Sequence, residues 1–163
     1  MNKSPTVLII GRDNPVSGKL ELLQGMNATV LATPDFDPTD RGQVASTISH
    51  FRPDVIVNTF LFTNPDFAEQ NPNTCRTLNQ RSVENLVDAC RSQPGCRLVH
   101  LGSSLLFGDE KPPRTAPYCE SDTPQPKGVL AESLLEAERI VAELPQHFII
   151  RPGDIFSVPD LSG

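Results

Sequence analysis

Few side chains in this 163-residue sequence have the type and spacing that catalysis or metal binding requires. Tyr118 is the only tyrosine, and the residue four positions later is Asp122 rather than a lysine that would lower the tyrosine pKa. None of the cysteines forms a CxxC pair or has a histidine at ligand spacing, so we expect free thiols and no metal site. The four are Cys75, Cys90, Cys96 and Cys119.

The elements that would position these side chains follow from an alternation of short apolar runs and longer amphipathic stretches. The apolar runs, bounded by Gly, Pro or Asp, predict strands over Val7–Ile10, Thr29–Ala32, Val55–Asn58, Arg97–Leu101 and Phe148–Ile150. The amphipathic stretches predict helices over Pro15–Leu23, Arg41–Phe51, Asp66–Ser92 with a break near Pro72, and Val129–Glu143.

Strands that alternate with helices predict a doubly wound α/β fold. We expect one Rossmann-like domain over residues 1–163, with a parallel sheet of about five strands and helices on both faces. The proline-rich stretch Asp109–Gly128 predicts a long loop. Ligands bind beyond the carboxyl ends of such strands, so Gly11, Asn58–Thr63 and Gly102–Gly108 should share one edge.

Composition narrows the partners. The chain carries 20 acidic and 14 basic residues, a net charge of −6, which argues against a nonspecific nucleic-acid binder. No window approaches the roughly 20 apolar residues of a membrane span, and the N-terminus does not have the pattern of a secretory signal. Free thiols fit a reducing compartment, so we expect a cytoplasmic protein without nucleic-acid or membrane partners.

Several motifs appear together in one order. They are Asp37-Pro38-Thr39-Asp40, Pro53–Asn58 followed by Thr63-x-x-Asp66-x-Ala68-Glu69, Asn79 with Val83–Leu86, His100–Gly108, Pro117–Pro126 and Arg151-Pro152. Together they resemble the extended short-chain dehydrogenase/reductases, and within these the sugar nucleotide-binding family of the dTDP-4-dehydrorhamnose reductases. The resemblance implies a Rossmann fold, NADP or NAD as cofactor and a nucleotide or nucleotide-sugar ligand.

The catalytic pair of that family is missing. The resemblance implies a tyrosine that passes a proton to the substrate carbonyl and, four residues later, a lysine that lowers its pKa and holds the ribose. Leu130 and Leu134 stand at these two positions, although Ser133 and Glu138 match the family in register. Leucine cannot relay a proton, so we expect the usual reduction to be absent.

The phosphate loop is altered as well. The family's G-x-x-G-x-x-G corresponds to residues 11–17, where only Gly11 remains in register. Asn14 could adopt a left-handed conformation or cap the helix, Arg12 could pair with a phosphate, and Val16 would line the cofactor groove. A turn that binds nothing is the other interpretation, because Pro15 removes a donor.

Other positions also have two interpretations. Ser103 stands where the family has the Ser or Thr that binds the substrate carbonyl, or it caps a loop. Asp37 lies near the adenine in the family, or it belongs to the turn before a helix whose N-cap is Thr39 or Asp40. By resemblance Asn58 and Thr63 line the cofactor groove.

Four more positions are given structural roles. Phe60 and Leu61 replace small residues of the family and would narrow the cofactor groove. Asn79 is expected at a kink or a structural water, and His100 as a buried, hydrogen-bonded residue.

We therefore expect a degenerate, inactive relative that acts as a binding or regulatory protein. The alternative is an NAD(P)H-dependent reductase of a keto sugar nucleotide with an atypical or shared active site, using Ser103, Tyr118 and Asp122. A third possibility is a scaffold that binds no ligand. The family's later, substrate-binding part has no counterpart in the sequence, so a homo-oligomer or a protein partner is expected to cover the apolar surface that this part would cover.

Overall fold

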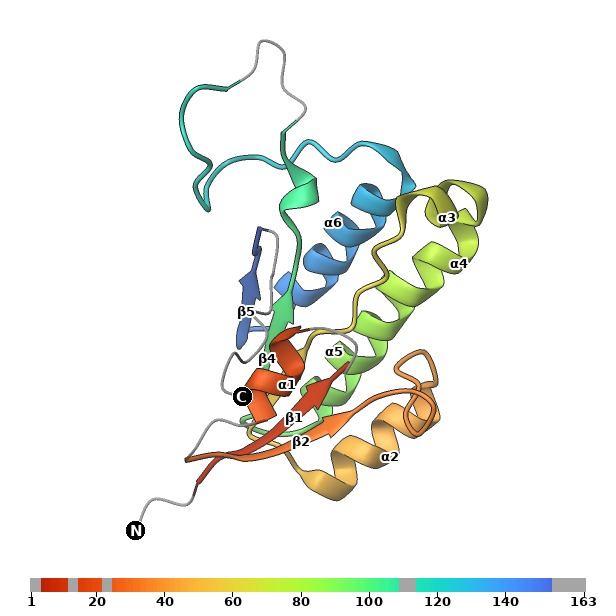
Figure 1. The fold of residues 1–163 in the computed structure, drawn as a ribbon. Helices are drawn as coiled ribbons and strands as arrows, with labels where there is room; N and C mark the ends of the chain where they lie inside the picture. Colours follow the sequence, from red (N-terminus) through yellow and green to blue (C-terminus); the bar gives the residue numbers. More distant parts are fainter. Residues whose placement is uncertain (1–3, 12–14, 22–24, 109–113, 154–163) are drawn as a thin grey trace, which may run out of the picture.

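The computed structural model describes residues 4–11, 15–21, 25–108 and 114–153, and these residues form a parallel sheet flanked by helices (Figure 1). The strand order is β2-β1-β3-β4-β5, and every neighbouring pair is parallel. The strands are β1 Thr6–Ile10, β2 Asn27–Leu31, β3 Val55–Asn58, β4 Arg97–Leu101 and β5 His147–Ile150. The predicted Rossmann-like fold class is confirmed, and each predicted strand lies within two residues of an observed one.

The helices also follow the predicted pattern. They are α1 Pro15–Glu21, α2 Arg41–Phe51, α3 Pro65–Gln70, α4 Pro72–Arg76, the π-helix η1 Thr77–Arg81, α5 Ser82–Ser92, the 3-10 helix η2 Ser104–Leu106 and α6 Gly128–Ala142. The predicted break near Pro72 is confirmed: α3 ends at Gln70, and Pro72 begins α4, where its missing N–H leaves no helical bond unmade. Asn79 lies in the π-helix, so the expected kink is found there.

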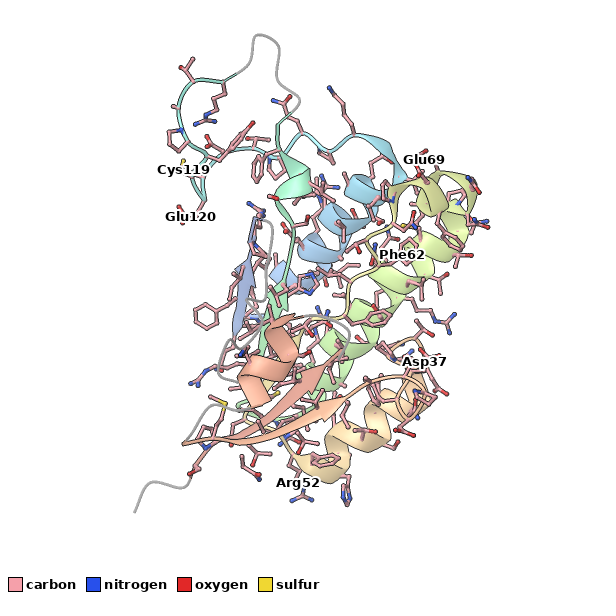
Figure 2. The ribbon with its side chains drawn as sticks, viewed as in Figure 1. Asp37, Arg52, Phe62, Glu69, Cys119 and Glu120 are labelled. Carbon is pink, nitrogen blue, oxygen red and sulfur yellow. The ribbon has the colours of Figure 1, made fainter. Side chains whose placement is uncertain are left out.

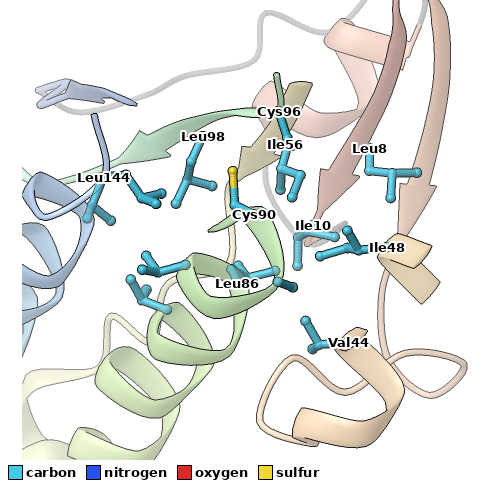
Figure 3. Close-up of a cluster of buried hydrophobic side chains, with 14 of the residues drawn as sticks. Leu8, Ile10, Val44, Ile48, Ile56, Leu86, Cys90, Cys96, Leu98 and Leu144 are labelled. Atoms are coloured by element: carbon cyan, nitrogen blue, oxygen red, sulfur yellow. The ribbon is translucent and has the colours of Figure 1, made fainter. Parts of the chain in front are cut away.

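Side chains on β1 show how the sheet is covered. Leu8 and Ile10 pack into the main core with α2, α5 and α6, as Figure 3 shows for its principal members. Val7 and Ile9 point to the opposite face, where Leu20 of α1 packs against the cluster that contains them. Alternate residues of a strand face opposite sides, so helices cover both faces, as predicted.

The sheet's outermost strand leaves apolar side chains exposed. Phe148 and Ile150 of β5 are 61% and 51% exposed. Residues 114–127 carry no helix or strand, as predicted for this part of the loop, and Figure 1 shows the chain there standing away from the sheet. Among the helices described, none is long and apolar enough to cross a bilayer.

Candidate functional site

A cavity of about 530 Å³ lies at the carboxyl edge of the sheet. Its walls come from the ends of β1, β2 and β4, from the residues after β3, and from Pro152 and Gly153 beyond β5. Of the segments predicted to share one edge, Gly11, Asn58–Thr63 and Gly102–Gly108, the cavity brings together Gly11, Thr59–Leu61, Thr63 and Gly102–Leu105. No titratable side chain is among the described residues that line the cavity; its polar side chains are the hydroxyls of Thr33, Thr59, Thr63, Ser103 and Ser104.

The turn after β1 depends on Gly11. Its φ is +103°, and a Cβ there would lie 2.9 Å from both the Phe60 nitrogen and the Thr59 Oγ1. Only glycine allows β1 to approach the residues after β3 this closely. Ser17, at the motif's last position, is completely buried, and Val16 lines the cavity. Arg12 and Asn14 lie outside the described residues.

The end of β3 carries a buried polar pair beside the cavity. The Asn58 amide Nδ2 donates to Nδ1 of His100 over 3.0 Å, and its Oδ1 accepts the Phe60 N–H over 3.1 Å. The Asn58 amide is thus used inside the fold, and Asn58 is not among the described residues that line the cavity. Thr63 does line the cavity.

His100 is buried and hydrogen-bonded, as predicted, but only through one ring nitrogen. Because Nδ1 accepts from Asn58, the ring proton lies on Nε2, which is buried without a partner in the described structure. Desolvation by burial lowers the pKa of His100 to about 4. His100 is therefore neutral at pH 7, and its hydrogen bond with Asn58 gives it a structural role.

The end of β4 brings two serines to the cavity. Ser103 and Ser104 both line it, and Ser103 Oγ accepts the Leu105 N–H over 3.1 Å at the start of η2. The capping interpretation of Ser103 is thus confirmed. Its hydroxyl also lies at the cavity, where its proton remains available to an acceptor.

On the other side of the cavity, the loop after β2 supplies walls that the sequence did not single out. Ala32, Thr33, Phe36 and Pro38 line the cavity. Asp37 is exposed and turned to Thr39, whose N–H and hydroxyl both donate to its Oδ1 over 2.8 Å.

Thr39 and Asp40 were the two predicted N-cap residues of α2, and the structure identifies which of them has this role. It is Asp40, whose carboxylate accepts the Gln43 N–H over 3.0 Å. The sequence signal available for the wall formed by Phe36 was an aromatic residue directly before the Asp37-Pro38-Thr39-Asp40 motif.

Leu130 and Leu134, where the resemblance predicts the family's tyrosine and lysine, lie in α6 inside an apolar cluster. Leu130 and Leu134 are 4% and 1% exposed and cluster with Ala68, Cys75 and Leu106. Neither residue lines the cavity. The two leucines therefore pack as core residues.

The hydroxyl between the two leucines is satisfied within the fold. Ser133 Oγ donates to the Leu130 carbonyl over 2.7 Å and accepts from Asn79 Nδ2 over 3.0 Å. Asn79 Oδ1 in turn accepts the Phe62 N–H over 2.9 Å. Ser133 and Asn79 thus join α6 to η1 and to the segment after β3.

Further along α6, an ion pair joins the helix to the chain after β5. Glu138, 2% exposed, receives two Arg151 nitrogens on Oε2, at 2.7 and 2.9 Å. A side chain at Gly102 would collide with Glu138 Oε1, so this position needs glycine for space. Arg151 also lies over the Phe107 ring, with its guanidinium carbon 5.4 Å from the ring centroid.

The sole tyrosine lies at a second cavity of about 830 Å³, beside β5. Figure 2 shows the neighbouring Cys119 and Glu120 on the loop, far from Asp37 at the other side of the fold. Tyr118 stacks on Phe107 with ring centroids 4.6 Å apart. Tyr118 is not among the residues that line the cavity at the sheet edge.

Asp122, the other residue of the alternative active site, is held as a carboxylate. The Cys119 N–H, 2.7 Å away, lowers the pKa of Asp122, and so does Arg114 at 2.9 Å. A carboxyl with a lowered pKa is ionised at neutral pH and cannot donate the proton that a reduction needs.

The cysteines are free thiols. A hydrogen bond with Cys90 and burial both raise the pKa of Cys96, so it remains protonated. Cys75 contacts the Ser133 hydroxyl over 3.3 Å. Across the described ranges, no three His, Cys, Asp or Glu side chains are grouped to hold a metal ion.

Comparison with known proteins points to one family. The family described as RmlD substrate binding domain matches residues 5–160. The dTDP-4-dehydrorhamnose reductase of Sinorhizobium fredii is 36% identical over 128 residues, 78% of this chain and 42% of that protein. That of Salmonella typhimurium is 32% identical over 117 residues, 70% and 37% of the two chains. The chain thus spans less than half the length of these relatives.

Solved structures agree. The dTDP-4-dehydrorhamnose reductase of Bacillus anthracis, in complex with NADP, has a TM-score of 0.85 at 25% identity. The match covers 94% of this chain and 55% of the Bacillus anthracis chain. The UDP-glucose 4-epimerase of Thermus thermophilus, in complex with NAD, has a TM-score of 0.75 at 20% identity, over 84% and 50%, and supports the fold alone. The chain therefore belongs to the family described as RmlD substrate binding domain, and the two curated relatives named above are dTDP-4-dehydrorhamnose reductases.

Proposed function

We propose that this protein binds a nucleotide at the carboxyl edge of its sheet and acts by binding, as a regulatory or partner protein, without reducing a sugar nucleotide. One observation carries the proposal: none of the described side chains around the 530 Å³ cavity can titrate. A ketone reduction needs an acid beside the carbonyl oxygen, and serine and threonine hydroxyls alone are poor acids.

The two leucines of α6 support this proposal. Restoring an acid at position 130 or a cation at position 134 would put a polar group into the cluster with Ala68, Cys75 and Leu106. Burying such a group without a partner is costly, so this part of the fold favours apolar residues. Leu130 and Leu134 pack there as buried core residues.

Binding and turnover measured on one preparation test the proposal. We would titrate the purified protein with NADPH and NADH by calorimetry, then add dTDP-4-dehydrorhamnose and follow nicotinamide absorbance. We expect binding without oxidation. NADPH consumption that depends on the sugar nucleotide would overturn the proposal.

A matched variant locates any turnover that is seen. Tyr118→Phe removes the only phenol and preserves the ring that stacks on Phe107. If the second cavity held an atypical active site, this variant would lose turnover. Our proposal expects wild type and variant to be equally inactive and to bind nucleotide equally.

A contact with a second copy of the chain is proposed at β5. This strand is at the edge of the sheet, and its Phe148 and Ile150 side chains are exposed. Two identical edge strands related by a two-fold axis present complementary surfaces to each other. Light scattering at micromolar concentration should detect a dimer that Phe148→Asp disrupts. A monomeric wild type would contradict this contact without affecting nucleotide binding.

A further inference from the structure

We propose that Cys90 and Cys96 form a redox-active pair: a peroxide oxidises the two thiols to an intramolecular disulfide, and a small thiol reduces it again. Cys90 lies in the last turn of α5, and Cys96 directly precedes β4. The pair therefore lies at the amino end of β4, whereas the cavity lies at the carboxyl edge of the sheet. The inference goes beyond the proposed function and does not depend on it.

A tight turn brings the two cysteines together. The Gln93 N–H donates to the Cys90 carbonyl, and the Cys96 N–H donates to the Gln93 carbonyl, each over 3.1 Å. Pro94 and Gly95 occupy the central positions of this turn, and the φ of Gly95 is +80°, as a type II turn favours. The chain thus reverses directly after α5 and returns Cys96 toward the last turn of the helix.

The two side chains are in contact. A hydrogen bond joins the Cys90 and Cys96 thiols. Both residues belong to the main core cluster, and both are among the core side chains drawn in Figure 3. Two sulfurs in hydrogen-bond contact can reach bonding distance by rotation of their side chains, without the backbone movement that distant cysteines need. The pair is therefore placed to close a short disulfide loop.

Solvent lies close to this pair. Cys90 and Cys96 are 4% and 6% exposed, whereas Cys75 is completely buried. Gly95 and Arg97, on either side of Cys96, are exposed. Because exposed turns open more readily than the core, a local opening here admits a small oxidant to the pair while Cys75 stays protected.

The two sulfurs have different roles in the oxidation. The hydrogen bond from Cys96 lowers the pKa of Cys90. The same hydrogen bond, burial and the nearby Asp54 carboxylate raise the pKa of Cys96. A thiolate is the nucleophilic form of cysteine, so Cys90 is the sulfur that attacks the oxidant and Cys96 is the sulfur that completes the disulfide.

The reaction is balanced with hydrogen peroxide as the oxidant. The Cys90 thiolate attacks one peroxide oxygen, so that an S–O bond forms, the O–O bond breaks and the leaving hydroxide takes a proton to become water. The Cys96 sulfur then attacks the Cys90 sulfur and gives up its proton, while the S–O bond breaks and a second water leaves. Two equivalents of a small thiol reverse the change by thiol–disulfide exchange and leave as their own disulfide.

Peptide mapping of the full chain tests this inference. Arginine stands at 81, 91 and 97, so trypsin places Cys90 on Ser82–Arg91 and Cys96 on Ser92–Arg97. After treatment with hydrogen peroxide, unfolding with N-ethylmaleimide and digestion without reductant, mass spectrometry should find these two peptides linked. Dithiothreitol should separate them. Maleimide on both cysteines, or a bond from either of them to Cys119, would overturn the inference.

Two variants distinguish the pair from an exposed thiol. Cys119→Ser removes the exposed cysteine and should leave the link between the two peptides unchanged. Cys96→Ser should abolish the link and leave Cys90 as a sulfenic acid that dimedone traps; Cys96→Ala replaces it if the serine variant does not fold. Loss of the link in Cys119→Ser, or a folded Cys96 variant without a dimedone adduct on Cys90, would contradict the assigned roles. Titration with NADPH tests the proposed function separately.

Discussion

Two regions near the carboxyl edge of this sheet differ in what they contain. Around the cavity between β2 and β4, the described side chains are uncharged and leave about 530 Å³ open. In α6, Leu130 and Leu134, where the resemblance predicts the family's tyrosine and lysine, are buried among apolar residues. On the same helix, Ser133 donates a hydrogen bond to the Leu130 carbonyl and Glu138 forms an ion pair with Arg151. The difference teaches that neighbouring regions of one fold can use their side chains differently: α6 uses them for packing, whereas the sheet edge leaves a cavity open.

Truncating Leu134 tests the packed region most strongly. Leu134→Ala removes a side chain that is 1% exposed and should lower the free energy of unfolding by about 3–5 kcal/mol through lost burial and a cavity. Leu134→Met, which preserves volume, should cost less than about 1.5 kcal/mol. Urea denaturation measures both. A small loss for Leu134→Ala would mean that this helix face is loosely packed, and the contrast between the two regions would weaken.

The ion pair beside the packed region ranks next. Glu138→Ala leaves Arg151 without its bidentate partner and should destabilise the fold by about 3 kcal/mol. On the same helix, Glu136→Ala removes an exposed partner of Arg139 and should change stability by less than about 1 kcal/mol. Thermal denaturation compares the two. Equal effects would show that burial does not strengthen the Glu138 bond.

Lowering the pH should reduce the free energy of unfolding, because His100 is buried beside the cavity in its neutral form. Its folded pKa of about 4 lies below the ordinary 6.5, so the unfolded chain takes up a proton first as pH falls. The stability due to neutral His100 is complete above pH 6.5 and is lost between pH 6.5 and 4, by up to about 2–3 kcal/mol.

Replacing the histidine should remove this dependence. His100→Gln should have a shallower stability profile between pH 6.5 and 4 than wild type, whereas His50→Gln, at the exposed end of α2, should follow wild type. Urea midpoints across this range provide the measurement. Identical slopes for wild type and His100→Gln would refute the role of His100.

Substituting Gly11, in the turn after β1, should have the smallest of these effects on the free energy of unfolding, and it should also weaken nucleotide binding. Gly11→Ala places a Cβ against Phe60 and Thr59 at φ +103° and should cost about 2 kcal/mol and weaken nucleotide binding. Gly25→Ala has a φ of +90° but no atom within 4 Å of its Cβ, and should cost about 1 kcal/mol without changing binding. If the two variants bind alike, the close approach at Gly11 does not shape the site.

Much of the fold was predictable because its signals are local. The apolar runs identified all five strands, and Pro72 marked the break before α4. The candidate site was only partly predictable. Gly11, Val16, Thr63 and Ser103 do line the cavity, but Asn58 does not. Its amide could not be assigned in advance because its partner, His100, lies 42 residues away on another strand.

The sequence by itself determined the alternation of strands and helices, and it has leucine at 130 and 134, where the resemblance predicts a tyrosine and a lysine. These features follow from side-chain periodicity and residue type, which neighbouring positions set. Only the tertiary structure decided that Phe36 and Pro38 form one wall of the cavity, that Tyr118 belongs to another cavity, and that no described titratable group faces the first. The lining of a cavity depends on how distant segments pack and which hydrogen bonds their side chains have already made, so the order of residues along the chain does not reveal it.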